Sequence, residues 1–135
     1  MAKILVVEDD EAMRVFLAKA LERVGHDVET APDAESADAL LRSQVVDLLL
    51  ADIELPGDNG VELARRAVHK NPDLCVLFVT GFDELASQAN GFLAKKSCIL
   101  SKPFYLSDLT HQVSTMLKGV APPAIAAPVN HGGPA

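Results

Sequence analysis

The sequence predicts an α/β fold in which helices cover both faces of a doubly wound parallel sheet. Two observations lead to this prediction. Five short apolar runs alternate along the chain with amphipathic stretches, which is the pattern of successive βαβ units. The third and fourth runs are apolar at nearly every position, as expected of strands that are buried on both faces. A chain of 135 residues is long enough to build one such domain around its own core.

In the first half of the chain, strands and helices follow one another with short connections. The expected elements are a strand at 3–7, a helix at 10–24, a strand at 27–30, a helix at 33–42 and a strand at 46–51. The two helices carry apolar residues at intervals of three and four, and Gly25 after the first of them is a typical stop signal. The apolar positions of the first helix are Met13, Phe16, Leu17, Ala20, Leu21 and Val24.

The second half of the chain continues the alternation. The expected elements are a helix at 59–69, a strand at 74–79, a short strand at 99–100 and a helix at 106–117, which Gly119 closes. Another helix should lie within 82–97, but Asn90 and Gly91 interrupt its pattern, and glycine costs a helix about 1 kcal/mol relative to alanine. We therefore expect 82–97 to be the most mobile part of the domain.

The segment 120–135 shows no periodic pattern. Its sequence, VAPPAIAAPVNHGGPA, contains four prolines and two glycines. This composition predicts a disordered tail. We therefore expect one folded domain at residues 1–119 and no second, effector domain.

The composition argues against several classes of function. The formal net charge is −7 and the basic residues form no cluster, so binding of nucleic acid is not expected. No run of about 18 apolar residues is present to span a membrane, and the N-terminus does not read as a signal peptide. These features predict a cytoplasmic protein. Cys75 and Cys98 lie in apolar, strand-like runs and are expected to be buried free thiols.

Polar residues stand at the carboxyl ends of four predicted strands, where open α/β sheets bind their ligands. They are Glu8, Asp9 and Asp10 after the first strand, Asp52 and Glu54 after the third, Thr80 after the fourth, and Lys102 and Pro103 after the fifth. Each has an ordinary interpretation by itself, as a helix cap, a turn residue or a solvated charge. Their convergence on one edge of the sheet favours a shared site instead.

The chemistry of this edge points to Mg²⁺ and to phosphate. Two unit charges about 4 Å apart repel by about 4 kcal/mol at an effective dielectric constant near 20, so several carboxylates need compensation. A hard divalent cation with oxygen ligands provides it, and Lys102 adds a fixed positive charge. An aspartate can also act as a nucleophile and form an acyl phosphate. The residues therefore indicate Mg²⁺-dependent phosphorylation of a carboxylate.

Four motifs in this order resemble the receiver domain of bacterial two-component response regulators. They are ILVVEDDE at 4–11, DLLLADIELPGDNG at 47–60, FVTGF at 78–82 and LSKPF at 100–104. The resemblance covers residues 2 to about 118. It implies the flavodoxin-like (CheY-like) fold, with five parallel strands in the order 2-1-3-4-5 and five helices.

The resemblance also assigns roles at the site. Asp52 matches the phosphoacceptor, Asp9 the direct Mg²⁺ ligand, and Glu8 an acid that reaches the metal through water. Glu54 matches the position whose backbone carbonyl binds the metal.

Three further positions match groups that respond to the phosphate. Thr80 matches the hydroxyl that binds the phosphoryl group, and Lys102 matches the lysine that pairs with it. The peptide bond before the proline that matches Pro103 is usually cis in the family.

One position departs from the family pattern. Ile99 stands where many members carry a tyrosine or phenylalanine that moves with the threonine. An aliphatic side chain cannot make that aromatic movement, so we expect phosphorylation to be read through the loop and helix after Thr80. Phe104 and Tyr105 offer an aromatic patch nearby for a partner, although core packing also accounts for Phe104.

Within the family, FVTGF and LSKPFYLSDL are similar to the CpdR-type single-domain regulators. That resemblance implies an adaptor that, while unphosphorylated, primes the ClpXP protease through its ClpX unfoldase. A histidine kinase or a histidine phosphotransfer protein would then supply the phosphate. The chain itself would be no enzyme beyond its own phosphorylation and dephosphorylation.

Other functions remain open at this stage. A phosphate shuttle or sink without a protease role differs from the adaptor only in its partner. A chemotaxis-type motor binder is disfavoured by Ile99. A haloacid-dehalogenase-like phosphatase would carry its nucleophile on the first strand and a second aspartate two residues later, where this chain has Glu54. In a flavodoxin, the acids at 8–10 would repel the flavin phosphate.

Overall fold

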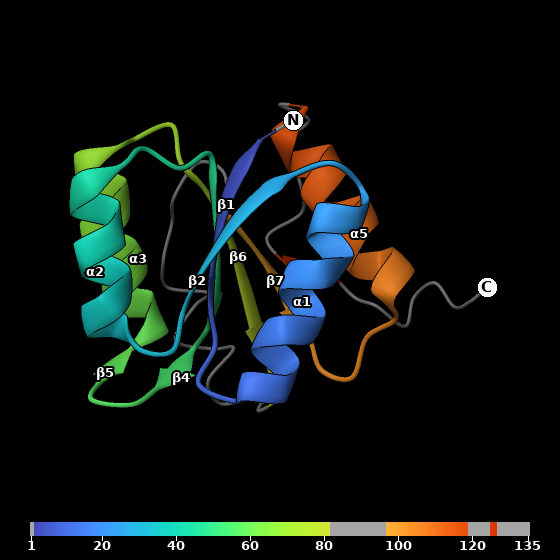
Figure 1. The fold of residues 1–135 in the computed structure, drawn as a ribbon, viewed down its shortest axis with the longest axis horizontal. Coiled ribbons are helices and arrows are strands. Elements are labelled where there is room, and N and C mark those ends of the chain that lie inside the picture. The colour runs from blue at the N-terminus through green and yellow to red at the C-terminus, as the bar shows by residue number, and fades with distance from the viewer. Residues whose placement is uncertain (1, 82–96, 119–124, 127–135) are drawn as a thin grey trace.

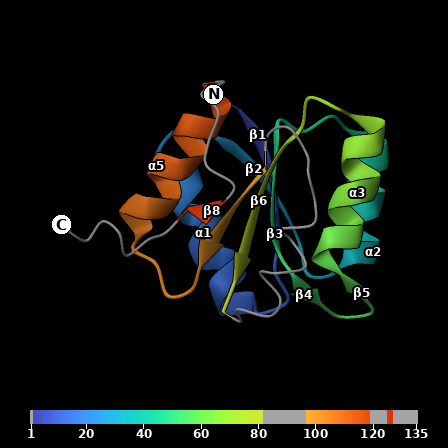
Figure 2. The same ribbon diagram turned by 180° about the vertical axis from the view of Figure 1, so that it is seen from behind.

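The computed structural model describes residues 2–81, 97–118 and 125–126, and has a parallel sheet between two pairs of helices (Figures 1 and 2). The main strands are β1 (Lys3–Val7), β2 (Asp27–Ala31), β3 (Leu48–Asp52), β6 (Cys75–Thr80) and β7 (Ser97–Ser101). The helices among the described residues are α1 (Glu11–Arg23), α2 (Ala34–Ser43), α3 (Gly60–Lys70) and α5 (Leu106–Leu117). These elements agree with the predicted ones to within a few residues.

The sheet has the predicted topology. Its order is β2-β1-β3-β6-β7, followed by the short strand β8 (Ile125–Ala126), and all pairs are parallel. For the five predicted strands this is the order 2-1-3-4-5, which confirms the flavodoxin-like prediction. The fifth predicted helix falls within 82–97 and so lies almost wholly outside the described residues.

Alternate residues of each strand enter two separate cores because successive side chains point to opposite faces. Leu5, Leu49 and Phe78 pack with α2 and α3 on one face. Leu50 and Leu77 pack with α1 and α5 on the other. Figure 1 shows these two helix pairs on opposite sides of the sheet. The nearly continuous apolar runs of β3 and β6 follow from this double burial.

Side-chain caps fix where three helices begin. The carboxylates of Asp10 and Asp33 accept hydrogen bonds from the third residue of the turn that follows each of them, in α1 and α2. The side chain of Asn59 accepts one from Val61 N at the start of α3. Such caps satisfy backbone donors that the first turn of a helix leaves unpaired. They orient α1 and α3 beside the carboxyl edge of the sheet.

Several details differ from the sequence prediction. A hairpin of β4 (Glu54–Leu55) and β5 (Asp58–Asn59) was not expected, although Pro56 and Gly57 form its turn. Phe16 and Val24 were expected on the apolar face of the first helix but are 50% and 55% exposed. Phe16 lies at the border of the buried stripe, and Val24 is already the C-cap.

Two further predictions concern the cysteines and the tail. Cys75 and Cys98 are buried and form no disulfide, as predicted. Of the segment 120–135, the structure describes only Ile125 and Ala126, which pair with β7. Disorder in the rest of that segment stays a prediction. Within the described ranges, no helix has both the length and the apolar character needed to cross a bilayer.

Candidate functional site

The sheet brings the predicted polar residues to one edge. Asp52 is the last residue of β3 and Thr80 the last of β6, while Glu8 directly follows β1 and Lys102 directly follows β7. Adjacent strands are in register here, since Asp52 pairs with Val79 of the neighbouring strand. Parallel strands in register end side by side, and this places an acid, a hydroxyl and an amine next to one another.

Asp52 is held through both of its carboxylate oxygens. The residue is only 9% exposed. Its Oδ1 accepts a hydrogen bond of 3.0 Å from the backbone N–H of Glu54, and its Oδ2 accepts one of 3.0 Å from Lys102 Nζ. A nearly buried carboxylate is thus satisfied by one amide and one ammonium, which offsets much of its desolvation cost.

Glu8 is the most deeply buried acid of the site, at 2% exposure. Its Oε2 accepts a hydrogen bond from Asp10 N at 3.0 Å, and its Oε1 lies 3.4 Å from Lys102 Nζ. Burial raises the pKa of Glu8, and the neighbouring charge of Asp52 adds to the rise, against the opposing effects of Asp10 N–H and Lys102. A cation placed beside Glu8 would therefore stabilise the ionised form of its carboxylate.

Lys102 bridges these two acids. Its own burial lowers its pKa, but the hydrogen bond and charge of Asp52, together with the charge of Glu8, outweigh that effect and raise the pKa overall. The amine is therefore firmly protonated. Its backbone is fixed as well, since Lys102 N–H donates to Thr80 O at 2.8 Å. The Lys102–Pro103 peptide bond is cis, as the family resemblance implied.

The acids of this edge fit a divalent cation. Glu8, Asp9 and Asp52 each offer one carboxylate oxygen, and these three atoms lie within 4.8 Å of one another. Lys102 pairs with Glu8 and Asp52, and Asp9 adds a third carboxylate to the cluster, so the cluster keeps a negative charge that a hard cation would neutralise. Oxygen donors of this kind suit Mg²⁺, which often uses one or two carboxylates and keeps several waters. Asp9 is exposed, which leaves room for such waters.

Glu54 lies beside Asp52, as predicted. The metal ligand expected at this position is the backbone carbonyl of Glu54, not its carboxylate. That side chain is exposed, while the backbone N–H binds Asp52 Oδ1. Glu54 belongs to the hairpin that leaves β3 and returns to α3. The contribution of its carbonyl to a metal site stays a prediction.

Gly60 belongs to the site although the sequence did not single it out. Its N–H donates to Ile53 O at 2.7 Å, and a Cβ atom built on it would overlap the carbonyl oxygen of Asp52. The first residue of α3 therefore rests against the backbone of Asp52. Only the motif context, a glycine after the Pro56–Gly57 turn and the Asn59 cap, could have hinted at this contact.

The other predicted positions, which are Ile99, Phe104, Tyr105 and Thr80, differ in burial and packing. Ile99 is 2% exposed and packs in the core under α2 and α3, where Phe78 is its partner across the strands. Phe104 is half-buried against the opposite core, in agreement with a packing role. Tyr105 is 76% exposed at the start of α5. Thr80 is buried at the end of β6, within one residue of the partner of Asp52.

Comparison with known proteins identifies response regulator receiver domains as relatives of this chain. The family model for the response regulator receiver domain matches residues 4–114. The response regulator receiver protein CpdR of Brucella abortus is 43% identical over 117 residues, which are 87% of this chain and 98% of that protein. Several other curated relatives are longer proteins, of which the match covers 27% to 58%.

Solved structures agree with the same fold. A CheY-like receiver domain from Methanospirillum hungatei has a TM-score of 0.81 at 28% identity, over 89% of this chain and 96% of that one. The response regulator TrrA of Thermotoga maritima, solved in complex with Mg²⁺ and BeF, has a TM-score of 0.77 at 29% identity, over 86% and 99%.

Proposed function

Because the chain belongs to the response regulator receiver domain family, we propose that it is a switch controlled by phosphorylation of Asp52. One observation carries the proposal. The Asp52 carboxylate lies between the ammonium of Lys102 and the Glu54 amide, beside the acids Glu8 and Asp9. This arrangement offers an oxygen nucleophile with cationic and hydrogen-bonding groups around the position of an incoming phosphoryl group.

The phosphoryl donor would be a phosphohistidine of a histidine kinase or a histidine phosphotransfer protein. An oxygen of Asp52 attacks phosphorus, the P–N bond breaks, and its electron pair returns to the imidazole nitrogen. The imidazole leaves as the neutral ring when its other nitrogen already carries a proton. The product on this chain is an acyl phosphate, with one new P–O bond in place of the P–N bond.

The residues around Asp52 would divide the work of this transfer. Mg²⁺ bound by Glu8, Asp9 and Asp52 would supply charge neutralisation for the phosphoryl oxygens. Lys102, now 3.0 Å from Asp52 Oδ2, would exchange the carboxylate for a phosphoryl oxygen. The Thr80 hydroxyl would bind another, because Thr80 ends the strand next to that of Asp52.

The output we propose is regulated protein binding, as in the CpdR-type regulators. The chain is 43% identical to the Brucella abortus CpdR along nearly the whole of that protein. Its identity to the longer NtrC of Azospirillum brasilense is 33% and covers 27% of that protein, so the comparison favours a CpdR-type output. In this proposal the unphosphorylated protein acts in the cytoplasm as an adaptor for the ClpXP protease, and phosphorylation of Asp52 switches that contact off. In this proposal the chain catalyses only its own phosphorylation and dephosphorylation.

Labelling with a radioactive phosphodonor in Mg²⁺ tests the acceptor. Asp52→Ala should abolish the acid-stable, base-labile label, whereas Asp73→Ala should retain it. Asp73 is an exposed aspartate that precedes β6, at the opposite edge of the sheet. Retained label on Asp52→Ala would place the acceptor elsewhere.

A pull-down tests the output. The baits are the wild type, the wild type with Mg²⁺ and beryllofluoride as a stand-in for the phosphoryl group, and Asp52→Ala. Retention of the ClpX unfoldase by the first and third baits, but not the second, is the expected result. Recovery of only a kinase or phosphotransfer protein would identify a phosphate carrier instead.

A further inference from the structure

The hairpin that follows Asp52 is firmly packed at its base but not at its tip. Ile53 and Leu55 are buried in the core beneath α2 and α3. The turn residues Pro56 and Gly57 are exposed, and β5 begins at the half-buried Asp58. The hairpin has only two residue pairs, too few to hold a rigid shape by themselves.

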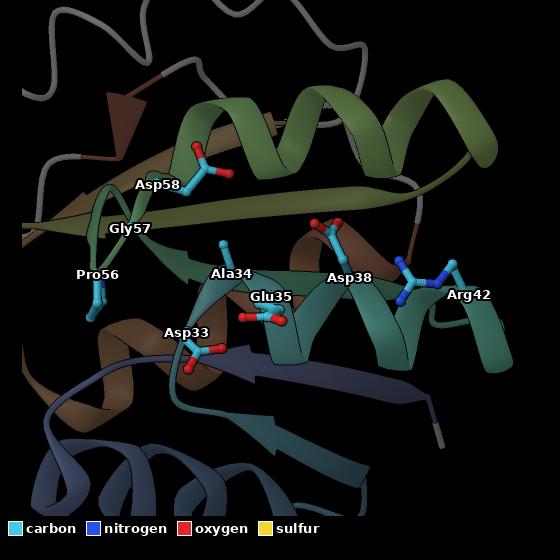
Figure 3. Close-up of a pocket in the computed structure, with 8 residues that line it drawn as sticks. All are labelled: Asp33, Ala34, Glu35, Asp38, Arg42, Pro56, Gly57 and Asp58. Atoms are coloured by element: carbon cyan, nitrogen blue, oxygen red, sulfur yellow. The ribbon is translucent and has the colours of Figure 1, made fainter.

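A hollow separates this tip from α2. Its volume is about 610 Å³, and it is lined by Pro56, Gly57 and Asp58 on one side and by residues of α2, including Glu35 and Asp38, on the other. Figure 3 shows the side chains of α2 and Asp58 on different sides of the open space. Apolar packing therefore does not fix the tip against α2.

Arg66 on α3 connects the two sides. Its Nη2 donates to Asp38 Oδ2 of α2 at 2.8 Å and to Asp58 Oδ2 of β5 at 2.9 Å, and its Nε donates to Asp38 Oδ1 at 3.3 Å. Hydrogen bonds from Asn59 N and from Arg66 lower the pKa of Asp58, so this carboxylate stays ionised at neutral pH. The planar guanidinium suits such a two-sided contact in a way that an ammonium does not.

From Arg66 a short chain of contacts leads to the phosphorylation site. Asp58 pairs with Leu55 in the hairpin, and Glu54 pairs with Asn59. The Glu54 N–H is the donor to Asp52 Oδ1. Because Glu54 pairs with Asn59, a displacement of Asp58 and Asn59 would be passed through this pairing to the Glu54 N–H and to the Glu54 carbonyl predicted to face the metal.

We propose that Arg66, by joining Asp38 and Asp58, is a positioning residue that holds the β4–β5 hairpin in the orientation needed for Mg²⁺ binding and phosphorylation at Asp52. The inference rests on the proposed function, since it concerns the same site. The proposed role of Arg66 differs from that of an ordinary surface ion pair, which would have only a small effect on stability. A positioning role requires an effect on metal affinity in protein that is fully folded.

Calorimetric titration with Mg²⁺ at 15 °C, in the full chain, measures that effect. Arg66→Gln removes the bridge, and Asp58→Asn removes only its connection to the hairpin. Arg65→Gln is the matched control, because Arg65 is the neighbouring exposed arginine and pairs with Glu62 within α3. Circular dichroism establishes that each variant is folded at this temperature.

We expect Arg66→Gln and Asp58→Asn each to weaken Mg²⁺ binding about fivefold, because an effect of that size matches the energy of one well-formed exposed ion pair. Both variants should also accept the label more slowly at saturating Mg²⁺. The double variant should be no weaker than either single variant, because both remove the same connection. Arg65→Gln should bind Mg²⁺ like the wild type.

The alternative outcomes separate the two proposals. Wild-type affinity in folded Arg66→Gln or Asp58→Asn, with at most a lower melting temperature, would reduce the bridge to a structural contact and overturn the inference. Failure of the wild type itself to bind Mg²⁺ and to accept phosphate would instead overturn the proposed function.

Discussion

Gly60 lies so close to Asp52 that a Cβ atom on it would overlap the Asp52 carbonyl oxygen. The contact joins the first residue of α3 to the last residue of β3, across the hairpin between them. The neighbouring hydrogen bond from Gly60 N to Ile53 O closes the same loop. The absence of a side chain at residue 60 thus sets the distance between the phosphoacceptor candidate and the helix behind it.

The first prediction is that Gly60→Ala destabilises the protein and disturbs the site. The added methyl group meets backbone, which cannot move as a flexible side chain does, and overpacking of this kind costs about 1–3 kcal/mol. Gly25→Ala, between α1 and the start of β2 at the opposite edge of the sheet, is the control. A Cβ there meets no atom within 4 Å, and only the left-handed φ of +100° opposes it, at about 1–2 kcal/mol.

Urea unfolding of both variants, together with phosphodonor labelling, checks this prediction. Gly60→Ala should lose labelling, while Gly25→Ala should label normally despite its lower stability. Equal labelling of both variants would show that the backbone of Asp52 tolerates displacement by α3.

The second prediction concerns repulsion within the acidic cluster. Without a divalent cation, Asp9→Asn should stabilise the protein by about 0.5–1 kcal/mol, because it removes one of three adjacent carboxylates at an exposed position. Mg²⁺ should stabilise the wild type, by about 2.7 kcal/mol at a concentration 100 times the dissociation constant. Asp9→Asn should lose most of this gain.

Thermal unfolding in Mg²⁺ and in EDTA measures both effects. Asp10→Asn is the matched control, since it makes the same change of charge one residue away and asparagine still caps α1. A response to Mg²⁺ that survives in Asp9→Asn but not in Asp10→Asn would move the metal site away from the proposed cluster.

The sequence was sufficient to predict Glu8, Asp52 and Lys102 as neighbours because that prediction depends on topology alone. The carboxyl ends of parallel strands meet at one edge, whatever the details of packing. Likewise, the alternation of apolar runs was enough to predict a parallel sheet, whereas the order of its strands was implied by the resemblance to receiver domains. Ile99 was noticed as a departure from a family pattern, and its complete burial agrees with a core role.

Other parts of the site depend on through-space contacts that leave no local pattern. The approach of Gly60 to the Asp52 backbone follows from the angle at which α3 leaves the hairpin, and a hairpin of two residue pairs has no periodicity to read. Arg66 and Asp38 are 28 residues apart and both resemble ordinary charges on helix surfaces. Only the folded arrangement of α2 and α3 brings them together.

The third prediction is a pH dependence that arises from Glu8. Burial raises the pKa of Glu8 in the folded state above its ordinary value of 4.5. Between these two values the folded protein binds more protons than the unfolded chain, so the contribution of Glu8 to stability falls as the pH rises. Above the raised pKa the penalty is complete, and below the ordinary value it is absent.

Urea unfolding from pH 4 to pH 7.5, in EDTA, should therefore show a changing difference between Glu8→Gln and the wild type. The variant should gain in relative stability as the pH rises, and the two should converge toward pH 4. Because Asp33 and Asp58, whose pKa values are lowered, are present in both proteins, their opposite dependence cancels in the difference. A difference independent of pH would contradict a raised pKa at Glu8.

The fourth prediction separates phosphorylation from its readout at Lys102. In Lys102→Ala the carboxylates of Glu8 and Asp52 lose their shared ammonium, at 3.4 and 3.0 Å, but the Asp52 nucleophile and the three acids remain. The variant should therefore fold in Mg²⁺ and accept phosphate slowly. It should not transmit the change, because no amine is left to move from the carboxylate to the phosphoryl group.

Amide spectra with and without beryllofluoride measure this transmission. In the wild type we expect shifts at Asp52 and also across 97–106, whereas in Lys102→Ala the shifts should be confined to residues next to Asp52. Lys118→Ala, an exposed lysine just after α5, serves as the control and should behave as the wild type. Shifts across 97–106 of equal size in Lys102→Ala would mean that Lys102 only neutralises charge, and that the signal leaves Asp52 by another residue such as Thr80.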